Sequence, residues 1–422
     1  MEVREGYKKT EMGVIPGDWE VINLAEKSTL KARIGWQGLT TKEYLSFGNY
    51  YLVTGTDLID NQIDWRNCCY VDKSRYEQDK NIQIKDGDLL VTKDGTIGKI
   101  AYIENMKKPA TLNSGVFVIR PVGGSYLPKY LFYVLSSTYF VNFLKQLTAG
   151  STIIHLYQKD FVKFNFLLPP LPEQQAIAEA LSDVDAVVSS LTKLISKKKK
   201  IKQGVMQELL TGEKRLEGFN GEWKIMHVSN IGKTYGGLAG KTKADFGHGN
   251  SKYIPFMNVM SNPVIDMGFL ENVKIADGEF QNNVKMGDLF FNTSSETPEE
   301  VGMCSVLLED VDNLYLNSFC FGFRVNDLSS FYPLYLSYFF RSDVGRKLMF
   351  SLAQGATRYN LSKNYFNKLR VALPGIEEQI AIANIISDMD AEIEALEQKL
   401  SKYKAIKQGM MQELLTGKIR LI

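Results

Sequence analysis

Several features that would fix the class of this protein are scarce or missing. Only four cysteines and three histidines occur among 422 residues, and the adjacent Cys68 and Cys69 lack the CxxC spacing of a metal site. We therefore expect reduced thiols and neither a bound metal nor a disulfide framework. The formal net charge is only +2. This excludes a globally basic nucleic-acid-binding protein and leaves only local basic patches for such a role.

Long apolar runs and catalytic patterns are missing as well. No stretch approaches the roughly 18 apolar residues that a membrane span requires. The segment MEVREGYKKTEMG at the start is polar and has no apolar signal core, so we expect a cytoplasmic protein. The histidines are scattered, and no complete phosphate-binding or cofactor-binding loop is present. We interpret the chain as a binding protein, not an enzyme.

The second half of the chain repeats the first. When Glu173 is aligned with Glu378, roughly 26 of about 44 residue pairs up to Leu216 and Leu421 are identical, without a gap. Shorter matches pair KDGDLL (85–90) with KMGDLF (285–290), LNSGVFVIRP (112–121) with LNSFCFGFRV (316–325), and PGDWEV (16–21) with NGEWKI (220–225). The chain is therefore two copies of one unit, each a variable domain followed by a helix that is conserved between the copies.

Each copy ends in a long predicted helix. Its apolar residues recur at steps of three and four, which is the seam of a coiled coil. The seam comprises Ile177, Leu181, Val184, Val188, Leu191 and Ile195 in the first copy, and Ile382, Ile386, Met389, Ile393, Leu396 and Leu400 in the second. Gly212 and Gly417 supply the C-terminal stops. Each helix of about 40 residues should be about 60 Å long. Since neither has another long apolar partner, we predict that the two pack antiparallel about a pseudo-two-fold axis.

The variable domains are predicted to be α+β. Runs such as DLLVTK, KIAYI and GVFVIRP are typical of strands, and glycines separate them. Residues 128–147 have helical periodicity. The predicted boundaries are 1–172 for the first domain, 173–216 for the central helix, 217–377 for the second domain and 378–422 for the distal helix.

The two ends of the chain are predicted to meet. The first copy continues past its helix as TGEKRLEGFNGEW, whereas the last copy stops at TGKIRLI. The chain begins with EGYKKTEMGVIPGDWE, which corresponds to the linker after the first helix. This correspondence predicts a circular organisation, with the N- and C-terminal segments side by side.

The repeated segments carry a family resemblance. LPPLPEQQAIAEALSDVDAVV with KQGVMQELLTGEKRL, and the second copy LPGIEEQIAIANIISDMD with KQGMMQELLTGKIRL, resemble the conserved regions of the specificity (S, HsdS) subunit of type I restriction–modification systems. GVIPGDWEV and TKDGTIGKIAYI resemble other parts of the same family. The resemblance covers essentially the whole chain.

The resemblance implies a non-catalytic DNA sequence-specificity subunit. Two target recognition domains would each read one half of a bipartite, asymmetric target in double-stranded DNA. The coiled coil would set the spacer between the halves and dock two methylation (M) subunits. These M subunits would bind S-adenosylmethionine, and restriction (R) subunits would use ATP and Mg, so no cofactor is expected in this chain. The alternative is a coiled-coil scaffold that joins two protein-binding domains without DNA specificity.

The candidate DNA contacts are polar, basic or aromatic side chains on loops, because such groups pair with phosphates and base edges. In the first domain they are Trp36, Gln37, Thr40, Lys42, Lys93, Thr96, Lys99, Ser151, Thr152, His155, Tyr157 and Gln158. In the second they are Lys241, Lys243, Asn250, Lys252, Asn292, Thr293, Ser294, Arg358, Asn360 and Lys363. Any single one is more often a solvated loop residue. The loops 149–160 and 354–364, however, occupy one place in both copies and differ in their polar side chains, as readers of different half-sites would.

Two features of the helices have competing interpretations. The basic run KLISKKKKIK (193–202) could follow spacer DNA, but such a run is more often the solvated face of a coiled coil. Apolar residues near the helix ends are predicted docking points for M subunits: Leu209, Leu210, Leu414 and Leu415.

Overall fold

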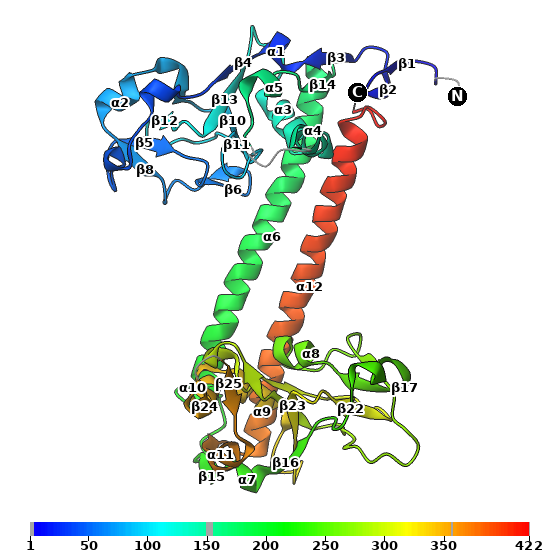
Figure 1. The fold of residues 1–422 in the computed structure, drawn as a ribbon. Helices are drawn as coiled ribbons and strands as arrows, with labels where there is room; N and C mark the ends of the chain where they lie inside the picture. The colour runs from blue at the N-terminus through cyan, green and yellow to red at the C-terminus, as the bar shows by residue number, and fades with distance from the viewer. Residues whose placement is uncertain (1–3, 149–154, 356–357, 422) are drawn as a thin grey trace. The chain divides into compact units, whose positions relative to one another are not determined.

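The computed structural model describes residues 4–148, 155–355 and 358–421. The chain forms two units, of which the first contains residues 1–192 and 399–422 and the second contains residues 193–398. The division runs through both long helices, so each unit holds a domain of strands and short helices together with part of each long helix (Figure 1). The α+β class and the repeated organisation are as predicted.

The first unit contains two four-stranded sheets, with strand orders β11-β10-β13-β4 and β8-β5-β12-β9. Strands β5 and β12 are parallel, and β10 lies antiparallel between β11 and β13. All four residues of β10 are buried, as expected for a central strand covered on both faces. The strands are β1 (Tyr7–Thr10), β2 (Gly13–Pro16), β3 (Glu20–Asn23), β4 (Ser28–Lys31), β5 (Tyr50–Val53), β6 (Leu58–Ile59), β7 (Gln62–Ile63), β8 (Cys69–Val71), β9 (Gln83–Ile84), β10 (Leu89–Thr92), β11 (Ile100–Tyr102), β12 (Ala110–Leu112), β13 (Val116–Pro121) and β14 (Asn165–Leu168).

The second unit repeats this plan. Its sheet β16-β23-β19-β21 corresponds to β4-β13-β10-β11, and its sheet β18-β17-β22 keeps the parallel pairing, now between β17 and β22. A third sheet has the order β20-β25-β24. The strands are β15 (Lys224–His227), β16 (Gly232–Gly236), β17 (Phe246–Ile254), β18 (Glu271–Val273), β19 (Leu289–Asn292), β20 (Ser294–Ser295), β21 (Cys304–Val306), β22 (Leu314–Leu316), β23 (Cys320–Val325), β24 (Ala353–Gln354), β25 (Tyr359–Leu361) and β26 (Arg370–Leu373).

The short helices flank the sheets. The segment 128–147, predicted from its helical periodicity, is two helices because the chain turns at Ser136 and Ser137. The Ser137 hydroxyl donates to the Val134 carbonyl (2.6 Å) and accepts the Tyr139 N–H (3.3 Å). The helices are α1 (Leu24–Lys27), α2 (Lys73–Glu77), α3 (Pro128–Leu135), α4 (Thr138–Thr148), α5 (Gln158–Phe161), α7 (Val228–Ile231), α8 (Phe256–Ser261), α9 (Pro333–Arg341), α10 (Asp343–Leu352) and α11 (Lys363–Lys368), with 3-10 turns η1 (Gly35–Gln37), η2 (Thr41–Glu43), η3 (Lys80–Ile82), η4 (Lys243–Asp245) and η5 (Pro298–Glu300).

The two long helices are α6 (Leu171–Thr211) and α12 (Ile376–Leu414), with 41 and 39 residues, as predicted. In the second unit Lys198 pairs with Glu392 at 2.7 Å, and Lys202 pairs with Asp390. The residue number rises along α6 as it falls along α12, so the segments run antiparallel, which confirms the prediction. In the first unit Lys407 pairs with Asp185 at 2.6 Å. Gly212, with a φ of 75°, directly follows α6, and Gly417, with a φ of 69°, closes the turn that follows α12.

The segments that match between the copies meet in an ion pair inside each domain. Asp88 is 1% exposed and accepts two hydrogen bonds from the Arg120 guanidinium, at 2.7 and 2.6 Å. In the second unit Asp288, also 1% exposed, accepts the corresponding bonds from Arg324 at 2.9 and 2.6 Å. Paired bonds between a guanidinium and a carboxylate fix geometry as well as charge. The same ion pair therefore helps to hold the corresponding strands together in both units.

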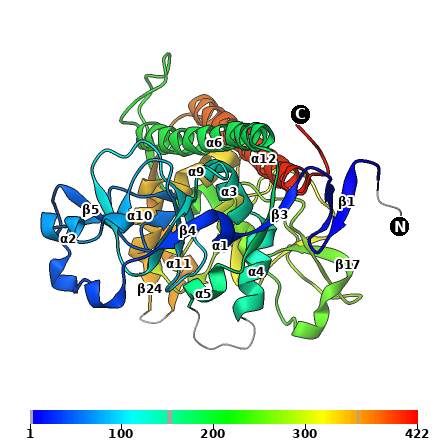
Figure 2. The same cartoon turned by 90° about the horizontal axis from the view of Figure 1, so that it is seen from above.

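The termini meet within the first unit. The Tyr7 hydroxyl donates to the Gly417 carbonyl at 3.0 Å, and Arg420 donates to Asp18 at 2.8 Å. Both views show the β1–β2 hairpin beside the C-terminal end of the chain (Figures 1 and 2). The predicted proximity of the two ends is confirmed.

Candidate nucleic-acid interface

Each domain presents a short turn that is closed by its own side chains. In the first unit the backbone N–H and the hydroxyl of Thr40 both donate to Glu43, at 2.8 and 2.9 Å. The Arg75 Nε donates to the other carboxylate oxygen at 2.6 Å. This is a capping box, which fixes the turn η2. Lys42 lies in this turn and is exposed.

The second unit has the same device. The backbone N–H and the hydroxyl of Thr242 donate to Asp245, each at 2.8 Å, and close the turn η4. Lys243 lies in this turn and is exposed. Each turn precedes or adjoins the strand that makes the parallel pairing, β5 or β17. An exposed lysine on a fixed turn suits a phosphate contact.

The Glu43 carboxyl gives the first turn a pH dependence. The Thr40 N–H, the Arg75 guanidinium and the Thr40 hydroxyl stabilise the carboxylate and hold its pKa at about 2, below its ordinary 4.5. A depressed folded-state pKa contributes stability that is present above the unfolded pKa and lost as the pH falls through the folded value. We expect Glu43→Gln to be less stable than the natural chain above pH 4.5, with the difference vanishing towards about pH 2. Chemical denaturation at a series of pH values measures this difference. A difference that is independent of pH would contradict the assignment.

Two predicted loops of the first unit come together. The Leu156 N–H donates to the Lys93 carbonyl at 2.9 Å, and the His155 ring pairs with Asp94. We call residues 92–99 with 155–159 the first junction. Tyr157, at its surface, is 53% exposed. The predicted contacts Ser151 and Thr152 and the side chain of Trp36 lie outside what the structure describes.

In the first junction, local contacts fix the backbone of residues 92–99. Gly98 has a φ of +77°, a backbone conformation that favours glycine, and a Cβ there would also meet the end of the Leu144 side chain of α4. The Lys99 N–H donates to the Thr92 hydroxyl at 3.0 Å. The Lys159 ammonium lies 5.5 Å from the centre of the Tyr157 ring. A cation and an exposed aromatic ring thus stand together on a fixed loop.

The corresponding loops of the second unit also meet. Strand β20 pairs with β25, and the Leu361 N–H donates to the Thr293 carbonyl at 2.8 Å. Part of a third predicted segment, 236–253, lies beside the end of β22, because the Leu238 N–H donates to the Leu316 carbonyl at 2.7 Å. Residues 317–319 lie here as well, because the Phe319 carbonyl accepts the Thr293 N–H at 2.9 Å. We call residues 292–295, 317–319 and 358–363 the second junction. Arg358 and Asn360 are exposed there.

Sequence reasoning missed Phe319 at the second junction. Its side chain is 55% exposed, although the residue lies directly before the buried strand β23. The Arg358 guanidinium lies 6.0 Å from the centre of its ring. The available signal was the change from LNSG to LNSF between otherwise matching segments.

Four predicted contacts are corrected to structural roles, because the structure buries their side chains. Gln37 is 6% exposed and Ser294 is 5% exposed. The Lys241 side chain is 7% exposed and pairs with Glu279. Asn292 is fully buried; its amide donates to two backbone carbonyls, at 2.9 and 3.1 Å, and accepts a backbone N–H at 2.6 Å. A buried polar side chain such as that of Asn292 supplies hydrogen-bond partners to backbone groups that are buried with it.

The other described candidates remain accessible and stay predictions. The exposed ones are Thr40, Lys42, Thr96, Tyr157, Gln158, Lys243, Asn250, Lys252, Arg358 and Asn360. The half-buried ones are Lys93, Lys99, His155, Thr293 and Lys363.

The predicted docking leucines also need correction. Leu209 and Leu210 are 4% and 0% exposed and belong to the core of the second unit. Leu414 and Leu415 are 4% and 3% exposed and belong to the core of the first. They close their own domains and offer no free apolar surface. Near the end of α12 lies instead a cavity of about 430 Å³, whose lining includes Thr138, Lys404, Lys407, Gln408 and Met411.

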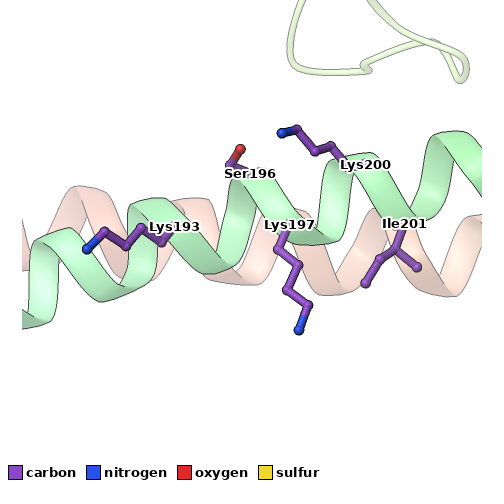
Figure 3. Close-up of a pocket in the computed structure, with 5 residues that line it drawn as sticks. All are labelled: Lys193, Ser196, Lys197, Lys200 and Ile201. Carbon is purple, nitrogen blue, oxygen red and sulfur yellow. The ribbon is translucent and has the colours of Figure 1, made fainter. Parts of the chain in front are cut away.

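The lysines of the basic run of α6 have two kinds of surroundings. Lys198 and Lys199 pair with Glu392 and Glu397 of α12, each at 2.7 Å, as in a solvated coiled-coil face. Lys193, Lys197 and Lys200 are exposed, and with Ser196 and Ile201 they line a shallow pocket (Figure 3). In the close-up Lys197 and Lys200 extend to different sides of the helix, so they do not form a single row. The structure favours the solvated-face interpretation for the paired lysines.

The comparisons with known proteins fit this geometry. A family model described as the type I restriction modification DNA specificity domain matches residues 16–203 and again 220–404. The chain belongs to this family. The type I restriction enzyme MjaVIII specificity subunit of Methanocaldococcus jannaschii is 26% identical over 99% of this chain and 96% of its own. The EcoKI specificity subunit of Escherichia coli is 21% identical over 97% and 90%.

Solved structures of the family share the fold. The S subunit of a type I restriction–modification system from M. genitalium has a TM-score of 0.60, covers 98% of both chains and is 14% identical. The chain is thus a DNA specificity subunit with two tandem recognition domains, and the scaffold alternative is not favoured. Among the described residues, no helix combines the length and hydropathy needed to cross a bilayer, and no cluster of side chains could hold a metal ion.

Proposed function

We propose that the first unit reads one half, and the second unit the other half, of an asymmetric bipartite target in double-stranded DNA. The observation that carries this is the pair of junctions. Both bring corresponding loops together on the same framework, yet one exposes Tyr157 and the other exposes Phe319 with Arg358. Different readers on one framework favour an asymmetric target, unlike the palindromes of symmetric dimers.

Within each half we assign phosphate contacts to the fixed turns and base contacts to the junctions. Lys42 and Lys243 would neutralise phosphates, which positions the domain without reading sequence. Arg358 and Asn360 would contact base edges, since arginine suits guanine and asparagine suits adenine in the major groove. These assignments are supported by the exposure of all four side chains.

We further propose that partner subunits supply all catalysis. Two M subunits would bind S-adenosylmethionine and methylate adenine in the target, and R subunits would use ATP and Mg to cleave DNA. The antiparallel segments of α6 and α12 would act as the spacer and docking element. Because the leucines at the helix ends are buried, docking would use the exposed polar surface of α12, including the cavity beside Lys404 and Met411. This chain would hold no cofactor.

The experiment that tests the proposal is co-expression of this chain with a cognate M subunit, followed by methylation-sensitive sequencing of the host DNA. We expect one split, asymmetric motif with N6-methyladenine in each half. A stable complex that methylates no motif, or only a palindromic one, would contradict the proposal.

Arg358→Ala is expected to lower affinity for the target roughly 5- to 150-fold, since a base-edge contact is worth about 1–3 kcal/mol. Binding to unrelated DNA should change little. The control is Arg370→Ala, which removes an exposed arginine on β26. The measurement is equilibrium binding to target and non-target duplexes at the same salt concentration. Equal affinities of Arg358→Ala and Arg370→Ala for the target would remove Arg358 from the interface.

A further inference from the structure

Phe319 is an apolar ring exposed on a rigid backbone. Its N–H donates to the Asn317 side-chain oxygen at 2.8 Å. Its carbonyl accepts the Thr293 N–H at 2.9 Å and the Thr293 hydroxyl at 2.8 Å. Both backbone polar groups of Phe319 are therefore hydrogen-bonded. The backbone is held in place, and the exposed position of the ring follows from the fold. An exposed ring that is held in place needs little further ordering when it binds.

One cation lies beside the Phe319 ring, and a second belongs to the same junction. The Arg358 guanidinium lies 6.0 Å from the ring centre. Lys363, which belongs to the same junction, is half-buried, and its ammonium lies 5.9 Å from the buried Phe321 ring. An aromatic ring beside an arginine occurs both at protein interfaces and at nucleic-acid interfaces. Nucleic acid is the occupant favoured here because the unit matches a DNA specificity domain. In that setting the ring would stack on a base while the cation contacts a phosphate or a base edge.

The first unit differs at this position. Gly115 takes the place of Phe319, and its carbonyl accepts the Lys93 N–H at 2.9 Å, as the Phe319 carbonyl accepts the Thr293 N–H. The framework is thus the same with and without the ring. Phe319 is therefore not needed to build the junction, and its presence in only one unit points to a role in recognition.

We propose that Phe319 is a wedge that stacks against one base-pair step of the second half-site and partly unstacks it, while Arg358 holds the adjacent DNA. Apolar side chains that enter a duplex in this way unstack and kink it. The first unit, with Gly115, does not distort its half-site by this route. The distortion makes the second half-site sensitive to the stacking strength of a step that no polar side chain contacts. This inference rests on the proposed function, because it requires that the second junction faces DNA.

The test uses the full chain, in complex with its M subunit, and duplexes of the motif found by methylation-sensitive sequencing. 2-Aminopurine replaces single adenines at successive steps of both halves, because its fluorescence rises when it is unstacked. The adenines that the M subunits methylate are left in place, because a methyltransferase flips its target base out of the duplex. The variants are Phe319→Ala, Phe319→Trp and the control Ile225→Ala. Ile225 is 63% exposed on β15 in the same unit and lies outside the junction.

We expect a fluorescence increase at one step of one half-site with the natural chain, Phe319→Trp and Ile225→Ala, and its loss with Phe319→Ala. The affinity of Phe319→Ala for the target should fall roughly 5- to 150-fold, the range for replacing an aromatic side chain that stacks on one base with alanine. Target binding by the natural chain without any fluorescence increase would overturn the wedge and leave half-site reading intact. Loss of M-subunit binding by Phe319→Ala, with DNA affinity unchanged, would make Phe319 a protein contact. A natural complex that does not prefer the target would overturn the proposed function itself.

Discussion

Replacing Asp88 with alanine is expected to lower the free energy of unfolding of the first unit by about 3 kcal/mol. The substitution leaves the Arg120 guanidinium without the carboxylate that accepts its two bonds. Breaking a buried ion pair from one side costs about 3–5 kcal/mol, and the partly exposed Arg120, whose side chain is 21% accessible, places the cost at the lower end. The Lys85 N–H also loses its acceptor, at 2.9 Å. Urea denaturation monitored by a probe in the first unit measures the effect.

The matched control is Asp86→Ala, which removes an exposed carboxylate two residues away. Among the described residues, Asp86 accepts one side-chain hydrogen bond, from the Met106 N–H at 3.0 Å, so a cost of about 1 kcal/mol or less is expected. Equal losses in Asp86→Ala and Asp88→Ala would show that the repeated Asp–Arg pair does not hold the domain together.

Replacing Glu173 with alanine is expected to cost about 3–5 kcal/mol, because the carboxylate joins three distant segments of the chain. Glu173 is 0% exposed. It accepts the Arg420 Nε at 2.6 Å and the Trp19 indole N–H at 2.8 Å. Its loss leaves the buried Trp19 indole N–H without its acceptor, whereas the Arg420 guanidinium keeps its two bonds to Asp18, which places the cost at the lower end of this range. Thermal and urea unfolding of the variant measure the loss, and the C-terminal segment should become sensitive to proteolysis.

The two copies supply a control within the chain. Glu378 accepts Arg215 at 2.6 Å, as Glu173 accepts Arg420, but the Trp223 indole N–H has no hydrogen-bond partner among the described atoms. Trp19→Phe should therefore cost about 1–3 kcal/mol by leaving the buried carboxylate short of a donor, and Trp223→Phe clearly less. If the two tryptophan variants lose the same stability, the hydrogen bond from Trp19 to Glu173 does not help to hold the N-terminal and C-terminal segments together.

The sequence repeat predicts much of the fold because each matched segment has a physical task. The apolar seams of both helices require a partner of equal length, and α6 and α12 supply it to each other. The glycine after each Leu-Leu-Thr ends its helix with a positive φ, as at Gly212. The pairing of Asp88 with Arg120 could not be predicted, because the repeat shows that both residues are kept but not that they meet. That fact depends on the register of β10 against β13.

The candidate site is less predictable, since a polar residue in a loop has two possible uses. Asn292 and Ser294 resemble base-contacting residues in sequence but serve the backbone of the second junction. Leu210 and Leu415 resemble exposed docking points because they lie at helix ends, yet the domains fold over those ends. Phe319 was missed for the opposite reason: an apolar residue is normally expected to be buried, so the change from LNSG to LNSF between the copies was not read as a sign of exposure. Only packing decides these cases.

The most direct test of independent half-site reading is to alter one junction at a time and sequence the methylated motif. One variant replaces Arg358 and Asn360 in the second unit, and another replaces Tyr157 and Gln158 in the first; each is co-expressed with the same M subunit. Each variant should change or relax one half of the motif, a different half in each case, with the other half and the spacer length preserved. Changes in both halves from a single variant, or identical changes from the two variants, would contradict the account that each unit reads its own half-site.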